Sequence, residues 1–128
     1  MVAAFDTNII ADVFRNKGES PKKILDYTDL YLPLVVTGEL LFGAYISANP
    51  TKTLQQVQDF ISTSKILFPQ SDVAENYAQI RKHLKEKGTP IPENDIWIAA
   101  TAHAFGLKLV TKDKHFAQID FLDVEFWG

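Results

Sequence analysis

Four acidic residues stand where the predicted elements of an α/β fold begin or end. Asp6 directly follows the apolar run Val2–Phe5, and Asp113 lies just beyond another apolar run. Glu39 and Asp95 each fall in the first turn of a predicted helix. Strand ends and the helix starts that follow them share one edge of a parallel sheet, where such folds bind ligands. The four carboxylates are therefore expected to meet at that edge.

A cluster of this kind has a defined chemistry. Carboxylates gathered within a few ångströms raise one another's pKa unless a cation is present. Hard oxygen ligands are preferred by Mg²⁺ and Mn²⁺, which activate water and stabilise the charge that develops in phosphodiester hydrolysis. We expect Asp6, Asp95 and Asp113 to place the metal, with Glu39 as a further ligand or as the general base.

Each acid also has a purely structural explanation. Asp and Glu are common in the first turn of a helix, where a carboxylate accepts hydrogen bonds from free amides and interacts favourably with the helix dipole. Asp6 is harder to explain in this way, because it directly ends a buried run. The joint pattern, rather than any one residue, predicts the metal site.

The elements that must position these acids alternate along the chain. The 128 residues are 46% apolar and 23% charged, which fits one globular domain over residues 1–128. The alternation predicts a single α/β domain with a mostly parallel central sheet and helices on both faces. The predicted strands cover residues 2–5, 30–36, 65–68, 107–110 and 124–127.

Helices are predicted between these strands. Their ranges are residues 8–14, 21–26, 37–47, a segment from Pro50, 71–87 and 94–105. Ser20, Thr37 and Ser71 are the expected N-caps, Asn49 and Pro50 are expected to start the fourth helix, and Gly88 is expected to end the long fifth helix.

Composition excludes several classes of protein. With no cysteine, the chain can form neither a disulfide nor a thiolate zinc site, which is compatible with a cytoplasmic location. Residues 1–6 do not resemble a signal peptide, and no apolar run approaches the ~18 residues of a membrane span. The net charge of −3 disfavours a general nucleic-acid binder, although a divalent metal could offset it. The basic groups are Lys22 with Lys23, Arg81 with Lys82, Lys85 and Lys87, and Lys112 with Lys114.

Every one of the four acids stands in a short motif. The motifs read FDTN at residues 5–8, VTGELLFG at 36–43, NDIWIAATA at 94–102 and LVTKDKHF at 109–116. In this order they resemble the D-T-[NS], T-x-x-E-L-x-x-G, N-D-x-x-I-A-A-x-A and L-V-T-x-D-x-x-F segments of the PIN-domain family, in particular its VapC-like ribonuclease toxins. The second motif has one residue fewer between its threonine and its glutamate.

The resemblance implies a function and a set of partners. It implies an endoribonuclease that depends on Mg²⁺ or Mn²⁺, held inactive by a cognate antitoxin in a type II toxin–antitoxin pair and commonly dimeric. By this resemblance the metal-site acids are Asp6, Glu39, Asp95 and Asp113. Thr7 and Asn8 would help to shape the site, and Thr111 would donate a hydrogen bond into it.

The chain departs from the family pattern at His115, where many relatives carry a further acid. This histidine could approach a phosphate, but an exposed turn residue is the favoured interpretation. His103 is predicted to be a structural histidine on a core helix. Helix periodicity predicts that four aromatic residues pack in the core, although an exposed subset could contact a second copy or an antitoxin. These residues are Phe42, Tyr45, Trp97 and Phe105.

Other phosphate-handling enzymes fit less well. A haloacid-dehalogenase-type phosphatase would need an acid where Asn8 stands, and a receiver domain would need an aspartate after the third strand, where residues 68–70 read FPQ. Dinucleotide and P-loop sites need glycine-rich turns that this chain lacks. The remaining alternative is a non-catalytic RNA-binding or interaction module with the same fold, which would not need metal.

Overall fold

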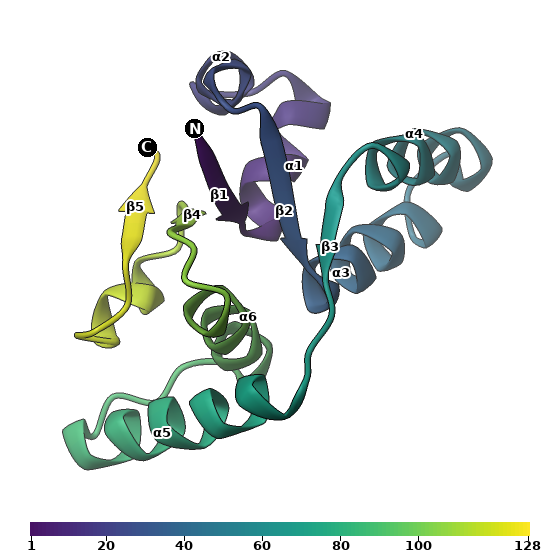
Figure 1. The fold of residues 1–128 in the computed structure, drawn as a ribbon. Coiled ribbons are helices and arrows are strands. Elements are labelled where there is room, and N and C mark those ends of the chain that lie inside the picture. The colour runs from purple at the N-terminus through teal and green to yellow at the C-terminus, as the bar shows by residue number, and fades with distance from the viewer.

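The computed structural model describes residues 1–128 and has at its centre a parallel sheet of five strands (Figure 1). The strands lie in the order β3-β2-β1-β4-β5, and every neighbouring pair is parallel. Their bounds are β1 Val2–Phe5, β2 Asp29–Pro33, β3 Lys65–Leu67, β4 Leu109–Thr111 and β5 Val124–Phe126. The predicted parallel α/β fold is confirmed, with β1 as the central strand.

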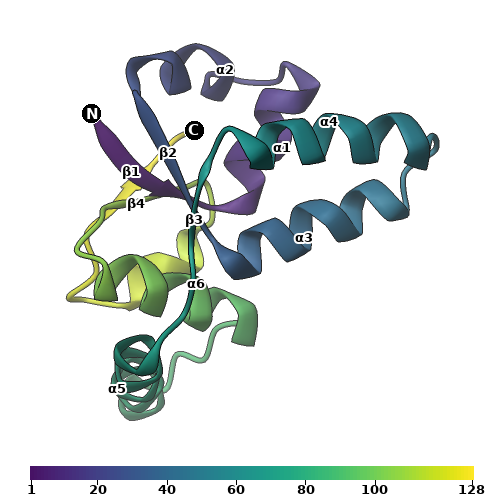
Figure 2. The ribbon, with the colours of Figure 1, turned by 45° about the vertical axis from the view of Figure 1, so that its right-hand side comes forward.

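Six α-helices and two short 3₁₀ helices connect the strands. The helices are α1 Thr7–Arg15, α2 Ser20–Lys23, α3 Leu34–Tyr45, α4 Pro50–Ser62, α5 Ser71–Lys87 and α6 Glu93–Ala104, with η1 Ile24–Asp26 and η2 Lys114–Gln118. Helices α3 and α4 run side by side, and α5 packs against α6 (Figures 1 and 2). None of the helices is both long and apolar enough to cross a membrane.

The central strands are covered on both faces. In β1, the consecutive residues Ala3, Ala4 and Phe5 are all completely buried. Successive side chains of a strand point to opposite faces, so neither face of β1 is open to solvent. Just after β5, the buried Trp127 packs edge-on against Phe5 and at a tilted angle against Tyr27. These aromatic contacts cover the core beside the last strand.

The predicted strand over residues 30–36 is wrong at its end. Strand β2 stops at Pro33, and α3 begins at Leu34. Thr37 is therefore not an N-cap: it lies inside the helix, and its hydroxyl donates to the Leu34 carbonyl at 2.6 Å. The residues after Pro33 are the apolar Leu34, Val35 and Val36, and such a short apolar run fits a strand or a helix equally well. Glu39 consequently lies in the second turn of its helix, not in the first.

The predicted start of α4 is correct, and two of the predicted N-caps are shifted. At the start of α4, the Asn49 side chain accepts the backbone N–H of Lys52 at 3.3 Å. Ser20 and Ser71 are the first residues of their helices, and the N-caps are Glu19 and Gln70, one residue earlier than predicted. Gly88 does end α5, with a φ of +69° that a glycine adopts without strain.

Several side chains assigned to the core are in fact exposed. Phe42, Tyr45, Phe105 and His103 all face solvent, so the core prediction is wrong for them. Trp97 is half-buried and stacks on Tyr77 with a centroid separation of 3.9 Å. Helices α3 and α6 are apolar on most sides, so periodicity could not show which side faces the sheet.

Candidate metal centre

Asp6 lies at the centre of the site because β1 is the central strand. As N-cap of α1, its Oδ1 accepts the backbone N–H of Thr7 at 2.8 Å. Its Oδ2 accepts the hydroxyl of Thr111 at 2.7 Å, across the pairing of β1 with β4. The side chain is almost completely buried. This one carboxylate therefore both caps α1 and forms part of the acidic site.

The loop after β4 carries the next acid. The backbone N–H of Asp113 donates to the Thr111 hydroxyl oxygen at 2.9 Å, and Asp113 Oδ1 accepts the backbone N–H of His115 at 2.9 Å as the N-cap of η2. The Asn8 side chain accepts the backbone N–H of Lys112 at 3.3 Å. Asn8 thus holds the loop that carries Asp113 and has no hydrogen bond to the acids themselves.

Glu39 reaches the site from α3. Its Oε1 accepts the Thr7 hydroxyl at 2.6 Å, and its Oε2 accepts the side-chain amide of Asn94 at 3.4 Å. Asn94 was not predicted as a site residue. Its position beside Asp95 in the NDIWIAATA motif was the signal available in the sequence.

His115 contributes a ring nitrogen to the same place. Its Nδ1 lies 3.1 Å from Asp113 Oδ1 and 3.6 Å from Asp95 Oδ2. The side chain is about half exposed, as an exposed turn residue should be. That interpretation nevertheless missed the contacts with two of the acids, which depend on how η2 packs beside the start of α6.

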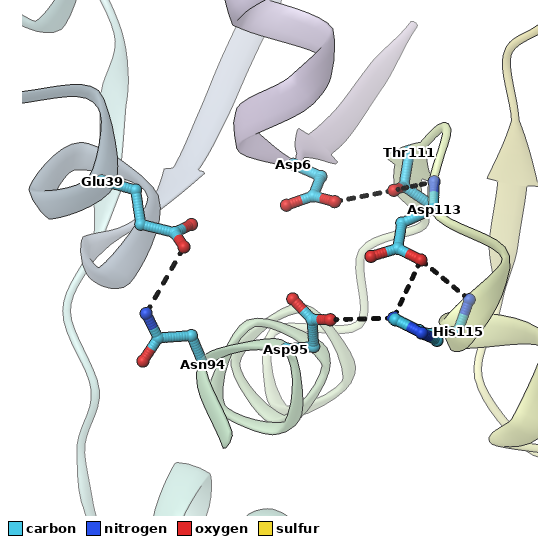
Figure 3. A network of polar contacts seen from close by, with 7 residues as sticks. All are labelled: Asp6, Glu39, Asn94, Asp95, Thr111, Asp113 and His115. Carbon is cyan, nitrogen blue, oxygen red and sulfur yellow. Dashed lines mark hydrogen bonds and ion pairs between the residues drawn. The ribbon is translucent and has the colours of Figure 1, made fainter. Parts of the chain in front are cut away.

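The four predicted acids come together from four separate segments of the chain. Figure 3 shows the carboxyl groups of Asp6, Glu39, Asp95 and Asp113 arranged around one central region. Asp6 follows β1, Glu39 projects from α3, Asp95 from the start of α6, and Asp113 from the loop after β4. Figure 3 also shows the contacts of Asn94 and His115 at the border of this group.

The electrostatics of the group are those of an uncompensated acidic cluster. Burial raises the pKa of Asp6 to about 6, and the charges of Glu39 and Asp113 add to the effect against the opposing hydrogen bonds from Thr111 and Thr7. Burial also raises the pKa of Asp95 to about 6, reinforced by the charges of the other three acids and opposed by His115.

A divalent cation would relieve this repulsion, and the donors fit one. Ligand atoms of Asp95, Asp113 and His115 all lie within 4.8 Å of one another. Asp6 and Glu39 lie outside this close trio, but both influence the pKa of Asp95 through their charge. A donor set made mainly of carboxylate oxygens suits Mg²⁺ or Mn²⁺.

Known proteins match this chain over nearly its whole length. The profile of the PIN domain matches residues 3–122. Ribonuclease VapC1 of Haemophilus influenzae (strain R2866) is 28% identical over 132 residues, covering 99% of this chain and 98% of the relative. The tRNA(fMet)-specific endonuclease VapC of Salmonella typhimurium is 32% identical over 125 residues, covering 95% of each protein.

Solved structures show the same fold. DNA-bound VapBC from Salmonella typhimurium matches with a TM-score of 0.89 at 30% identity over the whole of both chains. VapBC-1 from nontypeable Haemophilus influenzae matches with a TM-score of 0.88 at 26% identity, covering 99% of this chain and 98% of that one. From the match over nearly its whole length, this chain belongs to the PIN-domain family.

Proposed function

We propose that this chain is an endoribonuclease that depends on Mg²⁺ or Mn²⁺ and acts as the toxin of a toxin–antitoxin pair, with residues 1–128 forming one PIN domain. The observation that carries the proposal is the meeting of Asp6, Glu39, Asp95 and Asp113 at one edge of the sheet. Curated relatives over almost the full length are named as ribonucleases and as a tRNA-specific endonuclease. An RNA target puts the protein's action in the cytoplasm.

The side chains divide the work of the site. A bound divalent ion supplies Lewis-acid activation of water and neutralises phosphate charge. Asp6, Asp95 and Asp113 would hold the ion, and the Thr111 hydroxyl donates to one oxygen of Asp6. Glu39 serves as a further ligand or takes the proton of the attacking water.

Glu39 is well placed for either role. The Thr7 hydroxyl holds its Oε1, and the Asn94 amide holds its Oε2. With both oxygens accepting hydrogen bonds, the carboxylate keeps one orientation relative to the reacting phosphate, which is what a positioned general base requires.

The RNA strand has room beside these acids. A groove of about 410 Å³ between α1, α3 and α4 is lined by Thr7 and Glu39 at one end and includes Arg15. The guanidinium of Arg15 offers a phosphate contact in this groove, where Glu39 is the one acidic lining residue. A bound divalent ion would offset part of the protein's net charge of −3.

We assign the partner from the family and from the surface. Related structures are VapBC complexes. The exposed side chains of Phe42 and Tyr45 on α3 and of Ile46 just after it give this protein an apolar surface for a cognate antitoxin. A homodimer is part of the same proposal, and sedimentation of the purified protein measures it directly.

RNA cleavage by the purified protein tests the function. Cleavage is measured with Mg²⁺, with Mn²⁺ and with EDTA, for the wild type and for Asp6→Asn. Asp123→Asn is the matched control, because Asp123 is exposed, lies far from the acids in the fold and makes no side-chain hydrogen bond or ion pair. We expect cleavage that requires both the metal and Asp6 and that the control retains.

The alternative is a non-catalytic RNA-binding module. It would bind RNA equally well with metal and with EDTA, would leave the RNA intact, and would not respond to Asp6→Asn. Cleavage that persists in Asp6→Asn or in EDTA would instead show that the four acids are not the catalytic centre.

A further inference from the structure

The imidazole of His115 is the one aromatic nitrogen donor at a site otherwise made of oxygen donors. Its Nδ1 faces Asp113 Oδ1 and Asp95 Oδ2 at 3.1 and 3.6 Å. Its backbone N–H is bonded to Asp113, so the residue is fixed to the acid beside it. The neighbouring Lys114 turns away and places its Nζ 4.2 Å from the ring centre of Phe126. His115 is therefore the basic side chain that the chain directs at the acids.

We propose that His115 is an additional ligand of the metal centre and that it makes the centre select Mn²⁺ over Mg²⁺. The inference rests on the proposed function and adds the identity of the metal to it. Mg²⁺ is a hard ion that prefers oxygen donors and rarely accepts imidazole, whereas later divalent ions of the first transition row accept nitrogen more readily. One nitrogen in the donor set is enough to favour the second class.

The distances are those of donors that share one ion. At a metal–ligand distance of about 2.1 Å, neighbouring donors of an octahedral ion lie about 3.0 Å apart and opposite donors about 4.2 Å apart. The separations of 3.1 and 3.6 Å fall within that range. The bound of 4.8 Å on all separations in the trio exceeds the distance between opposite donors by about 0.6 Å. Small side-chain rotations suffice to bring the three atoms around one ion.

A second role for the ring makes a different prediction. A protonated His115 would simply neutralise Asp95 and Asp113, as an ion pair that occupies the place of a metal. In that case the ring nitrogen would never contact the ion, and removal of the ring would strengthen metal binding rather than change its selectivity.

Pulsed electron paramagnetic resonance of the Mn²⁺-loaded protein separates these roles. A coordinating imidazole gives a ¹⁴N coupling to the Mn²⁺ electron spin. We expect this coupling in the wild type, its loss in His115→Asp, and its retention in His103→Asn. The last variant is the matched control, because His103 is exposed near the C-terminal end of α6 and its side chain makes no hydrogen bond.

Calorimetric titration with each metal alone measures the selectivity. The ratio of the Mg²⁺ and Mn²⁺ dissociation constants should fall by roughly tenfold in His115→Asp, which restores an all-oxygen site. In His103→Asn the ratio should stay at the wild-type value. Because the substituted aspartate can still bind metal, loss of affinity as such does not decide the result.

The outcomes distinguish the two levels of the proposal. Bound Mn²⁺ without ¹⁴N coupling, or an unchanged ratio in His115→Asp, overturns the role of His115 and leaves the nuclease proposal intact. If neither Mg²⁺ nor Mn²⁺ binds, both the role of His115 and the nuclease proposal are overturned. Bound Mn²⁺ with the coupling, in a protein that cuts no RNA, supports the ligand assignment and counts against the nuclease.

Discussion

Replacing Asp6 with asparagine should stabilise the metal-free protein at neutral pH even though it abolishes RNA cleavage. The pKa of Asp6 is raised from 3.8 to about 6 by burial and by its acidic neighbours. Between these two values the folded protein holds a proton that the unfolded chain has lost. The free energy of unfolding of the wild type therefore falls as the pH rises through this window.

The size of the effect follows from the same interval. At ~1.4 kcal/mol per pH unit, the rise from 3.8 to about 6 corresponds to roughly 3 kcal/mol. Asparagine does not titrate, so the free energy of unfolding of Asp6→Asn does not show this decrease as the pH rises. Relative to the wild type, the variant should gain up to roughly 3 kcal/mol between about pH 4 and pH 7. Removing the charge of Asp6 also relieves Asp95, which acts in the same direction.

Urea denaturation in EDTA measures this difference between about pH 4.5 and pH 7.5 at constant ionic strength. The amide also alters the hydrogen bonds with Thr7 and Thr111, but that contribution does not depend on pH. The slope of the difference is therefore the diagnostic quantity, and Asp123→Asn is measured beside it as the control variant. A difference between Asp6→Asn and wild type that stays constant over this range, or that favours the wild type as the pH rises, would refute the electrostatic account.

Three further outcomes follow from the same contacts. Lys112→Met leaves the buried carboxylate of Asp12 without its ion-pair partner. Urea denaturation at neutral pH should show a free energy of unfolding lower by about 3 kcal/mol, and adding Asp12→Asn should restore part of this loss. Thr111→Val removes the hydroxyl that orients Asp6 and should weaken Mn²⁺ binding by roughly tenfold in calorimetry, without loss of the native circular dichroism spectrum. Mg²⁺ should raise the melting temperature more at about pH 7.5 than at about pH 5, because Asp6 and Asp95 must lose protons near pH 6 to bind the ion. An equal rise in melting temperature at the two pH values would contradict the raised pKa of these residues.

The sequence allowed the acids to be found because their positions depend on local signals. Asp6 ends a buried strand, and Asp113 stands just beyond another, so a parallel sheet brings both to one edge whatever the strand order. Glu39 was placed one helical turn too early, because the boundary at Pro33 was misjudged. It still reaches the site, since the helix that carries it starts from the same edge.

The contacts at the border of the site could not be predicted in the same way. Whether His115 meets Asp95 depends on how η2 packs beside the start of α6. Strand β4 separates these two elements in the sequence, so no local pattern indicates the contact. Asn94 meets Glu39 for a similar reason, across 55 positions of the chain. The exposure of Phe42 is a third case, because a helix that is apolar all round gives no sign of which side faces the sheet.

The long reach of the hydrogen bond between Thr111 and Asp6 has a consequence for the cell that makes this protein. That bond joins residues 105 positions apart, so β4 must be synthesised before Asp6 acquires this partner. A ribosome that has not yet made β4 holds a chain in which Asp6 and Asp113 cannot meet. Until that point of synthesis the growing chain lacks the acidic site.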